Sequence, residues 1–596
     1  MSGNVAAECR RAPARDVRTA SSRPRARSLV PVMVVVAVVL LAGCGLGAKH
    51  TSANPFRSGT SISVPAPSTS RPRAPVVVAS DDFNGAALST SRWKFVNPGR
   101  DAKQSMDGSH AVIEVPPGTD KVTHDPDASG DHAPRLMQPI RNGDFSFDTK
   151  FDAQVDKQFQ EQGVVVEQDE THYLYAAVVQ SYLKTSVVVS VVSDLGSQTQ
   201  SSSEIYNQPS IVLRVARTGD QWFVSYSYDS FHWTAADPFV DALVVKQVGV
   251  FAGNTGNKAP AFTAKFDSFL NTPSSSTPPV INVWYGADQT FGEHGRPQRW
   301  VNVLGDVADP AGMSKLTYTL NDGKAQPLSM GENLFRLVAP GEFNAEIDFA
   351  SLHTGPNLVA LTATDTGGRH STTVVTVNKV ADRTWPLPYI AKWSPPRGDV
   401  NAVAQVVDGH WAIEPDGTVR NLDFGFDRLV TIGDASAWKE YEATAQVTVN
   451  AMDPGGAGVG LIVGFQGATG DLHGFPTPDQ PRIGHPFPAA FLYANRRGAS
   501  PRAEIYANTD TEPERPLAVD TTGFRMTPGI AYTFKIDVTD DDAGGSLFRF
   551  KFWQTGAPEP SGWMLQTHGD LARGSLVLVA HRADVAFGTV TVTPAS

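Results

Sequence analysis

Short stretches in which hydrophobic and polar residues alternate, or in which hydrophobic residues form brief runs, recur along the chain from residue 77 to its end. Residues 145–151, 187–192, 211–217 and 222–228 are of this kind, and turn-forming residues separate them. Because successive side chains of a strand point to opposite faces, these stretches predict β-strands with a buried face. Almost no segment has a sustained helical period. We therefore expect an all-β chain of two-sheet sandwiches.

Two breaks divide this pattern. Residues 271–279 are rich in Ser, Thr and Pro, and a weaker break with two prolines lies at residues 380–388. Such composition is typical of linkers between domains. The sequence thus predicts three folded domains, at residues 77–271, 272–380 and 381–596.

The N-terminal region has a different composition. An apolar run of about 13 residues, 29–41, follows seven arginines and is too short to span a bilayer comfortably. Residues 1–43 are therefore predicted to be a signal peptide. The sequence Leu-Ala-Gly-Cys at residues 41–44 resembles the lipobox of bacterial lipoproteins. That resemblance implies acylation of Cys44 and anchoring of the exported chain to the outer face of the bacterial cell membrane; the alternative is an ordinary signal peptide with a chance cysteine.

Residues 44–76 contain few large apolar side chains and many Ser, Thr and Pro residues. A segment of this composition buries too little surface to offset the entropy of ordering it. We expect a disordered tether between the lipid anchor and the first domain.

Cysteine usage and charge restrict the partners. The chain has two cysteines, and Cys9 would leave with the signal peptide while Cys44 would carry lipid, so no disulfide is expected. The formal net charge is −11, and removal of the arginine-rich residues 1–43 makes the remainder more acidic. Nucleic acid needs a basic face and is excluded as a partner. Contact with the lipid bilayer is expected through acylated Cys44 only.

The first domain carries several motifs in a familiar order. They are residues 80–85 with Trp93, residues 163–170 followed by Tyr173, residues 222–233, and residues 262–269. Together they resemble the concanavalin A-like domains attached to family 43 glycosidases of the β-xylosidase type. The resemblance implies a jelly-roll sandwich and a structural calcium, for which Asp82 and Asp267 are the candidate ligands. Capping of turns by these two carboxylates is the alternative.

A catalytic strand in this domain is disfavoured by spacing. Concanavalin-like glucanases carry Glu-x-Asp-x-Glu, which places three carboxylates on one face of a strand. Here residue i+4 from Glu167 is Thr171, and Glu170 falls on the opposite face. A retaining glycosidase needs two carboxyl groups roughly 5 Å apart on one side of the sugar. We therefore assign no catalytic residue.

Aromatic side chains are the candidate sugar-binding groups of the first domain, since a flat ring can stack on a pyranose. The candidates are Tyr173, Tyr175, Trp222, Tyr228 and Trp233. Trp222 and Tyr228 fall on one face of a strand, and such a stripe is equally typical of a sandwich core. Both interpretations stay open from the sequence.

Two further resemblances describe the remaining domains. Residues 355–377 resemble the final hairpin of bacterial immunoglobulin-like modules, which implies a β-sandwich spacer. Residues 438–449, 458–465, 532–538, 548–553 and 558–563 resemble laminin-G or concanavalin A-like domains. A long loop, residues 468–488, holds three candidate ligand-binding residues, His473, Phe475 and His485; otherwise it covers a sheet edge.

The fold class predicted is thus all-β, with two concanavalin A-like jelly-roll sandwiches separated by an immunoglobulin-like β-sandwich. The predicted function is a cell-surface lipoprotein that binds a polysaccharide or another envelope component without catalysis. Two alternatives remain, an extracellular glycoside hydrolase or lyase whose acids converge only in the fold, and a purely structural or protein-contact module. No cofactor is predicted beyond the structural calcium.

Overall fold

The computed structural model describes residues 72–595, apart from 119–131, 182–183, 256–258, 273–276, 381–382, 395–398, 473–474, 477–479, 497–498, 509–514, 542–543 and 571–572. Within the described residues there are strands, turns and two short 3₁₀ segments, η1 (Phe349–Ser351) and η2 (Val400–Ala402), but no α-helix. The prediction of an all-β chain built of sandwiches is confirmed. The described part contains no helix long and apolar enough to cross a membrane. Cys44 and the predicted signal peptide lie outside the described residues.

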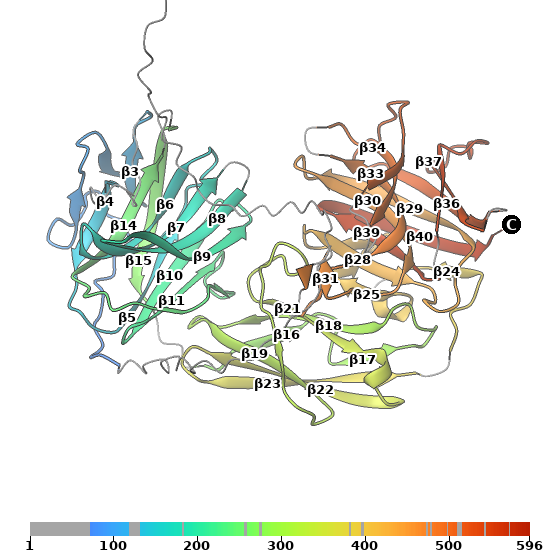
Figure 1. Cartoon of the computed structure of the whole chain (residues 1–596), viewed down its shortest axis with the longest axis horizontal. Coiled ribbons are helices and arrows are strands. Elements are labelled where there is room, and N and C mark those ends of the chain that lie inside the picture. Colours follow the sequence, from blue (N-terminus) through green and yellow to red (C-terminus); the bar gives the residue numbers. More distant parts are fainter. Residues whose placement is uncertain are drawn as a thin grey trace, which may run out of the picture. The chain divides into compact units, whose positions relative to one another are not determined.

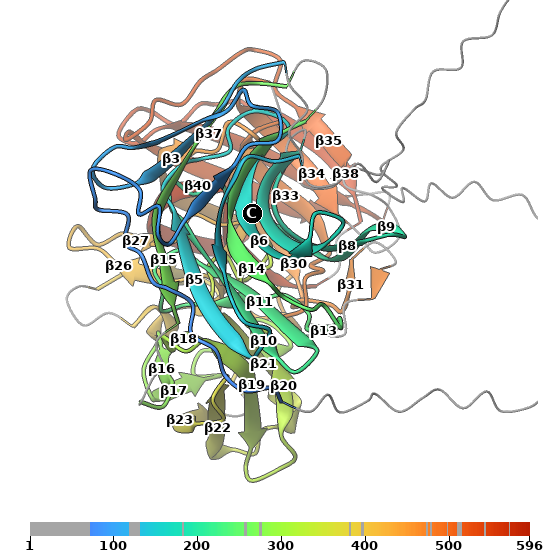
Figure 2. The same ribbon diagram turned by 90° about the vertical axis from the view of Figure 1, so that its left-hand side faces the viewer.

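The first sandwich consists of two sheets, coloured blue to green in Figure 1. Sheet A1 has the spatial order β1 (Lys94–Val96), β4 (Arg135–Pro139), β14 (Gln247–Asn254), β6 (Gln160–Asp169), β7 (His172–Ser181), β8 (Lys184–Ser193) and β9 (Gly196–Ile205). Sheet B1 has the order β12 (Thr234–Ala235), β11 (Gln221–Ser227), β10 (Ile211–Thr218), β5 (Phe145–Phe151), β15 (Phe262–Asn271), β3 (Ala111–Val115) and β2 (Lys103–Met106), with β13 (Phe239–Val240) beside β11. Figure 2 shows β5, β10 and β11 side by side.

The core of the first sandwich follows directly from alternation. Along β5 buried and half-buried residues alternate without a break, and Phe145, Phe147 and Phe151 enter the core with Trp222. The Trp222 indole Nε1 donates to the Asp241 carbonyl oxygen at 3.0 Å, which satisfies its one polar group. The apolar faces of the two sheets thus meet and exclude water, which is the main stabilising contribution.

The last part of the chain forms a second large sandwich, coloured orange to red in Figure 1. Sheet A3 has the order β25 (Gln405–Asp408), β28 (Asp427–Ile432), β39 (Ser575–His581), β30 (Ala457–Phe465), β33 (Phe487–Asn495), β34 (Arg502–Asn508) and β35 (Arg515–Val519). Sheet B3 has the order β26 (Trp411–Ile413), β27 (Val419–Asn421), β40 (Ala583–Pro594), β29 (Tyr441–Met452), β36 (Ala531–Asp540), β37 (Ser546–Gln554) and β38 (Leu565–Gly569), with β24 (Tyr389–Ala391) beside β40. A separate pair, β31 (Asp471–Leu472) and β32 (Phe475–Pro476), follows β30.

The two large sandwiches have the same strand order. The penultimate strand, β14 or β39, lies in the third position of sheet A1 or A3, between β4 and β6 or between β28 and β30. The final strand, β15 or β40, occupies the corresponding third position of sheet B1 or B3, counted from β2 or β26. Apart from β13, β24 and the pair β31–β32, every strand of one sandwich has a counterpart in the other. One topology is therefore used twice with little shared sequence.

Between the two large sandwiches in sequence, the chain forms a smaller pair of sheets. One has the order β16 (Val280–Val283), β18 (Trp300–Ala308) and β21 (Glu342–Asp348), and the other the order β17 (Asp288–Phe291), β23 (His370–Lys379), β22 (Gly355–Asp365), β19 (Met313–Leu320) and β20 (Gln326–Leu328). The hairpin β22–β23 forms where the sequence predicts it, with Gly368 at φ +83° in its turn. The immunoglobulin-like assignment and the three domain boundaries stay predictions.

Candidate functional site

Sheet A3 is apolar on both faces, and its outer face is the side turned away from the core of its sandwich. On β39 the residues Leu576, Leu578 and Ala580 enter the core, while Val577 and Val579 belong to a separate cluster on the outer face. Strand alternation requires this division. Because these outer-face residues are buried as well, the outer face of sheet A3 is largely shielded from solvent.

A cavity of about 350 Å³ lies on this outer face. It is lined by residues of β28, β30, β33, β34 and β39 and of their connecting loops. The lining residues with polar or aromatic side chains are Phe426, Asp427, His485, Phe487, Asn495, Arg496, Tyr506, Asn508, His581 and Arg582. Apolar side chains such as Ile462, Leu492 and Val579 complete the lining. A concave site that combines an apolar lining with a few polar groups is typical of a ligand-binding pocket.

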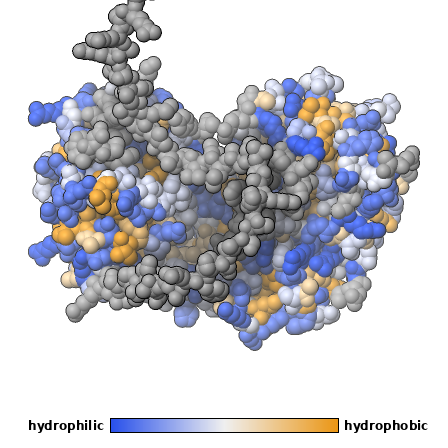
Figure 3. Space-filling view, viewed as in Figure 1, coloured by the Kyte–Doolittle hydropathy of each residue, from blue (hydrophilic) through white to orange (hydrophobic). Residues whose placement is uncertain are grey.

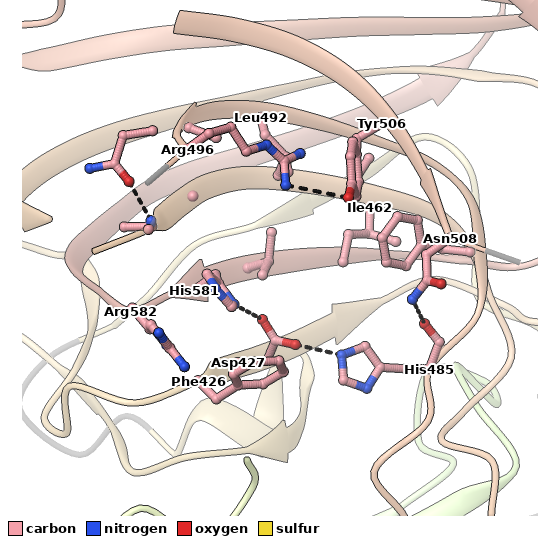
Figure 4. Close-up of a pocket in the computed structure, with 18 of the residues that line it drawn as sticks. Phe426, Asp427, Ile462, His485, Leu492, Arg496, Tyr506, Asn508, His581 and Arg582 are labelled. Atoms are coloured by element: carbon pink, nitrogen blue, oxygen red, sulfur yellow. Dashed lines mark hydrogen bonds and ion pairs between the residues drawn. The ribbon is translucent and has the colours of Figure 1, made fainter. Parts of the chain in front are cut away.

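Asp427 links two histidines at the cavity (Figure 4). His485 Nε2 lies 2.6 Å from one carboxylate oxygen of Asp427, and His581 Nδ1 lies 2.8 Å from the other. Burial disfavours the charged form of Asp427, but the charges and hydrogen bonds of His581 and His485 hold the pKa of Asp427 well below its usual range. An ionised carboxylate accepts from both rings, so each imidazole carries a proton on the nitrogen facing Asp427. Both rings are thereby held in one orientation.

The second nitrogen of His485 has a different environment. His485 is 8% exposed, and its Nδ1 atom is buried without a hydrogen-bond partner among the described residues. A buried polar atom left unpaired costs about 1–3 kcal/mol. A hydroxyl group of a ligand, which donates one hydrogen bond, would satisfy this atom.

The opposite side of the cavity is formed by β34 and the end of β33. Arg496 Nη2 donates to Glu504 at 2.9 Å, and the Arg496 guanidinium lies 4.1 Å from the centre of the Tyr506 ring. Asn508 Nδ2 lies 3.5 Å from the His485 carbonyl oxygen, at the limit of a hydrogen bond. Figure 4 shows these residues above the His485–Asp427–His581 group, with apolar side chains between. Tyr506 is thus held in place by a cation–π contact.

Hydrolysis of a glycosidic bond needs two carboxyl groups across the cavity. Among the described residues that line it, Asp427 is the single carboxylate, and both its oxygens are engaged by histidines. Glu504 lies behind the lining, fully buried between Arg496 and Arg502. The arrangement therefore offers groups for binding hydroxyls but no acid pair for a glycosidase mechanism.

The predicted aromatic residues of the first domain lie in several environments. Tyr173 and Tyr175 are buried on the outer face of sheet A1, and Trp222 is fully buried in the core. Trp233 is 2% exposed beneath the Arg214 guanidinium, 3.8 Å from its ring centre. The half-buried Tyr228 donates from its hydroxyl to Glu332 at 2.6 Å. These five side chains do not form one open surface.

The three candidate residues of the loop 468–488 have different outcomes. His485 lines the cavity of sheet A3, whereas His473 and the side chain of Phe475 lie outside the described residues. Sequence reasoning missed Asp427, His581, Tyr506, Asn508 and Arg582. Asp427 and His581 are direct partners in the β28–β39 register. Because the two residues are 154 positions apart in sequence, no local pattern marks that pairing.

The two calcium candidates have different surroundings. Asp267 belongs to a group with His110 and Asp152 whose ligand atoms lie within 4.8 Å of one another, while Asp82 is exposed and accepts from the Asn84 backbone N–H at 3.2 Å. Lys150 Nζ lies 3.1 Å from Asp152 and 3.4 Å from Asp267, so an ammonium group already balances these carboxylates. Calcium prefers six to eight oxygen ligands, and one imidazole, two carboxylates and a lysine do not fit that requirement.

The family model that matches this chain lies over the first sandwich. A family model described as "Protein of unknown function (DUF1349)", a concanavalin-like fold family, matches residues 97–274. No curated protein sequence matches the chain. Similar solved structures include the GH43 protein BlXynB of Bacillus licheniformis, at 20% identity and a TM-score of 0.27, with 32% of this chain and 38% of that chain covered. The match thus spans well under two thirds of that protein.

Two further structures represent other classes of protein. The carbohydrate-binding module CBM66 of Bacillus subtilis is 14% identical with a TM-score of 0.22, over 32% of this chain and 95% of that chain. An endo-β-galactosidase of Clostridium perfringens that releases GlcNAcα1-4Gal is 10% identical with a TM-score of 0.26, over 60% of this chain and 89% of that chain. At such scores, the description of fold and site rests on the strand pairing and contacts of this chain itself.

Proposed function

We propose that this protein binds glycan in the cavity on the outer face of sheet A3, without cleaving it. The observation that carries the proposal is that His485 lines a cavity of about 350 Å³ and that its buried Nδ1 atom has no partner among the described residues. A cavity of that size accommodates one or a few sugar rings, at the lower end of the usual range for ligand pockets.

The chemistry of the lining suits a sugar. The Tyr506 and Phe426 rings supply flat apolar surface for the C–H groups of a pyranose, while Asn508 and the imidazoles supply hydrogen-bonding atoms for its hydroxyls. The imidazoles are preset by Asp427, so little side-chain entropy is lost on binding. The support for a carbohydrate partner is therefore the mixture of rings and fixed polar atoms.

The location of this activity follows from the N-terminal sequence. Residues 1–43 are proposed to direct export, and acylated Cys44 is proposed to anchor the mature chain to the outer face of the membrane. The tether, residues 44–76, then carries the sandwiches within reach of envelope or environmental polysaccharides. Metabolic labelling with a fatty acid, lost in a Cys44→Ala variant, tests this anchoring.

The binding proposal is tested with the full-length chain in mild detergent. Its retention on a panel of plant and bacterial envelope polysaccharides is followed together with the release of reducing ends. We expect retention without release. A His485→Ala variant should lose retention, whereas a His568→Ala variant should keep it. His568 lies on β38, and its exposed imidazole pairs with Asp541. Released ends would contradict the non-catalytic role, and equal retention by both variants would contradict the site.

A further inference from the structure

The arginine at residue 582 is the feature of the cavity that glycan binding in general does not explain. Arg582 follows directly after β39 and lines the cavity. Its guanidinium has no carboxylate or carbonyl partner among the described residues, and its Nε atom is buried. Arg496 and Arg502, by contrast, both form ion pairs with Glu504. Arg582 is thus a cation at the cavity whose charge no described side chain balances.

The main chain holds Arg582 in an unusual conformation. Its φ angle is +45°, in the left-handed region that non-glycine residues seldom adopt. The Arg582 backbone N–H donates to the Gly425 carbonyl oxygen at 2.7 Å and to the Phe426 carbonyl oxygen at 3.1 Å. These bonds fix the position of the side chain at the cavity beside Phe426, whose ring centre lies 5.6 Å from the guanidinium carbon (Figure 4).

The charged residues that line the cavity are two arginines and one aspartate. The chain is acidic, with a formal net charge of −11. Asp427 is paired with two imidazoles and Arg496 with Glu504, whereas Arg582 forms no ion pair among the described residues. A cationic group at the cavity of an acidic chain attracts anions to that position. The carboxylate of Asp427 is occupied by two imidazoles, so the unbalanced donor is Arg582.

We propose that the cavity selects sugars bearing a carboxylate, such as uronic acids, and that Arg582 is the residue that recognises this group. The proposal rests on the glycan-binding function proposed above and names its ligand class. A guanidinium fork donates two parallel hydrogen bonds to a carboxylate, an arrangement that a neutral hydroxymethyl group cannot form. The uronate ring would then lie between Arg582 and the Asp427–histidine group, with its hydroxyls toward His485 Nδ1.

The test compares one ligand in two charge states. Oligogalacturonate and its methyl ester share their rings and hydroxyls, and only the first carries carboxylates. Titration calorimetry with the full-length chain in detergent should give an affinity for the free acid that is about tenfold higher than for the ester, the effect of a charge-assisted hydrogen bond. Arg582→Gln should lower the affinity for the acid to that for the ester.

Two controls keep the result specific. Arg525→Gln removes the same charge from an exposed position of the same sandwich and should keep the tenfold preference. Arg582→Lys keeps the positive charge without the planar guanidinium fork and should retain part of the preference for the acid. Circular dichroism checks that each variant folds. Equal affinity of the wild-type chain for acid and ester, or a preference that survives in Arg582→Gln, would overturn the proposal, as would tighter binding of a sulfated than of a carboxylated galactan.

The outcomes separate this inference from the function on which it rests. If neutral glycans bind and require His485 but the acid brings no gain, carboxylate recognition is wrong and the glycan-binding cavity stands. If neither acidic nor neutral glycans bind, the proposed function itself is wrong.

Discussion

The outer faces of sheets A1 and A3 sit on the same framework and have opposite character. On sheet A1, Arg135 of β4 and Glu167 of β6 form an ion pair of 2.6 Å, and the two side chains are 1% and 0% exposed. Tyr173 and Tyr175 are buried beside this pair. On sheet A3, the counterpart of β4 is β28, which begins with Asp427, and this carboxylate faces two imidazoles at a cavity. The outer face of sheet A1 is thus filled by buried side chains, whereas the outer face of sheet A3 has a cavity.

The comparison teaches that the framework leaves the outer face free to vary. The inner faces of the two sheets carry the same kind of apolar residues, such as Val164 and Val250 in sheet A1 and Leu461 and Leu578 in sheet A3. These residues are sufficient for the sheet-on-sheet core. The outer face makes no contribution to that core, so charge pairs, tyrosines or a cavity can occupy it without a change of topology. On the face of the molecule drawn in Figure 3, patches of apolar residues lie among polar ones.

The largest expected effect is a loss of stability when the buried ion pair on the outer face of sheet A1 is broken. A Glu167→Leu variant leaves the buried Arg135 guanidinium without this carboxylate, and we expect the free energy of unfolding of the first sandwich to fall by about 3–5 kcal/mol. Urea unfolding measures it. The double variant Arg135→Met, Glu167→Leu removes both charges and should recover most of the loss. A single variant as stable as the wild type would show that the pair does not hold the face closed.

Loss of the carboxylate on the outer face of sheet A3 should lower the free energy of unfolding by less. Asp427→Asn removes the charge that orients His485 and His581, and we expect a loss of about 1–3 kcal/mol at neutral pH. The pKa of Asp427 is lower in the folded chain than its ordinary value of 3.8, so its stabilising contribution is fully present above pH 3.8 and is lost as the pH falls below it. Unfolding measured from pH 7 to pH 2 should show the wild type and the variant converging at the acidic end, and a constant difference would contradict this origin.

Ligand binding should separate the tyrosines of the two faces. Tyr506 lines the cavity and receives a hydrogen bond from Arg496 at 3.3 Å, whereas Tyr175 is 3% exposed on sheet A1. Tyr506→Leu removes a ring available for stacking and should lower glycan affinity roughly tenfold, while Tyr175→Leu should leave it unchanged. Affinity is measured with any polysaccharide that the wild-type chain retains. The comparison fails if Tyr175→Leu weakens binding as much as Tyr506→Leu.

The smallest effect concerns the edge of sheet A1. Lys184 and Glu204 pair across β8 and β9, but their side chains are 63% and 39% exposed. Solvent screens such pairs, so Glu204→Gln should change the free energy of unfolding by less than about 1 kcal/mol. Urea unfolding under the conditions used for Glu167→Leu provides the measurement. A loss comparable to that of Glu167→Leu would remove the distinction between the buried pair and the exposed one.

The strands and the sandwich class were within reach of sequence reasoning, and the site was not. The alternation of residues 145–151 predicts a half-buried strand, and β5 occupies the same residues. His485 was a candidate because its loop is long and rich in aromatic and histidine residues. Its partners were invisible, since Asp427 and His581 meet only through the register of β28 and β39. For Trp222, alternation favoured the core but left a ligand surface open.

The amino-acid sequence by itself determined the all-β class of the chain and where many of its strands lie in the sequence, because alternation of apolar residues requires two-layer burial and turn residues end each strand. Tertiary structure decided which outer face is closed and which keeps a cavity. Strands of both sheets alternate with the same period, so a local pattern cannot distinguish the two outer faces. The difference arises from which strands become neighbours, and hence from whether Asp427 meets two histidines or Glu167 meets an arginine.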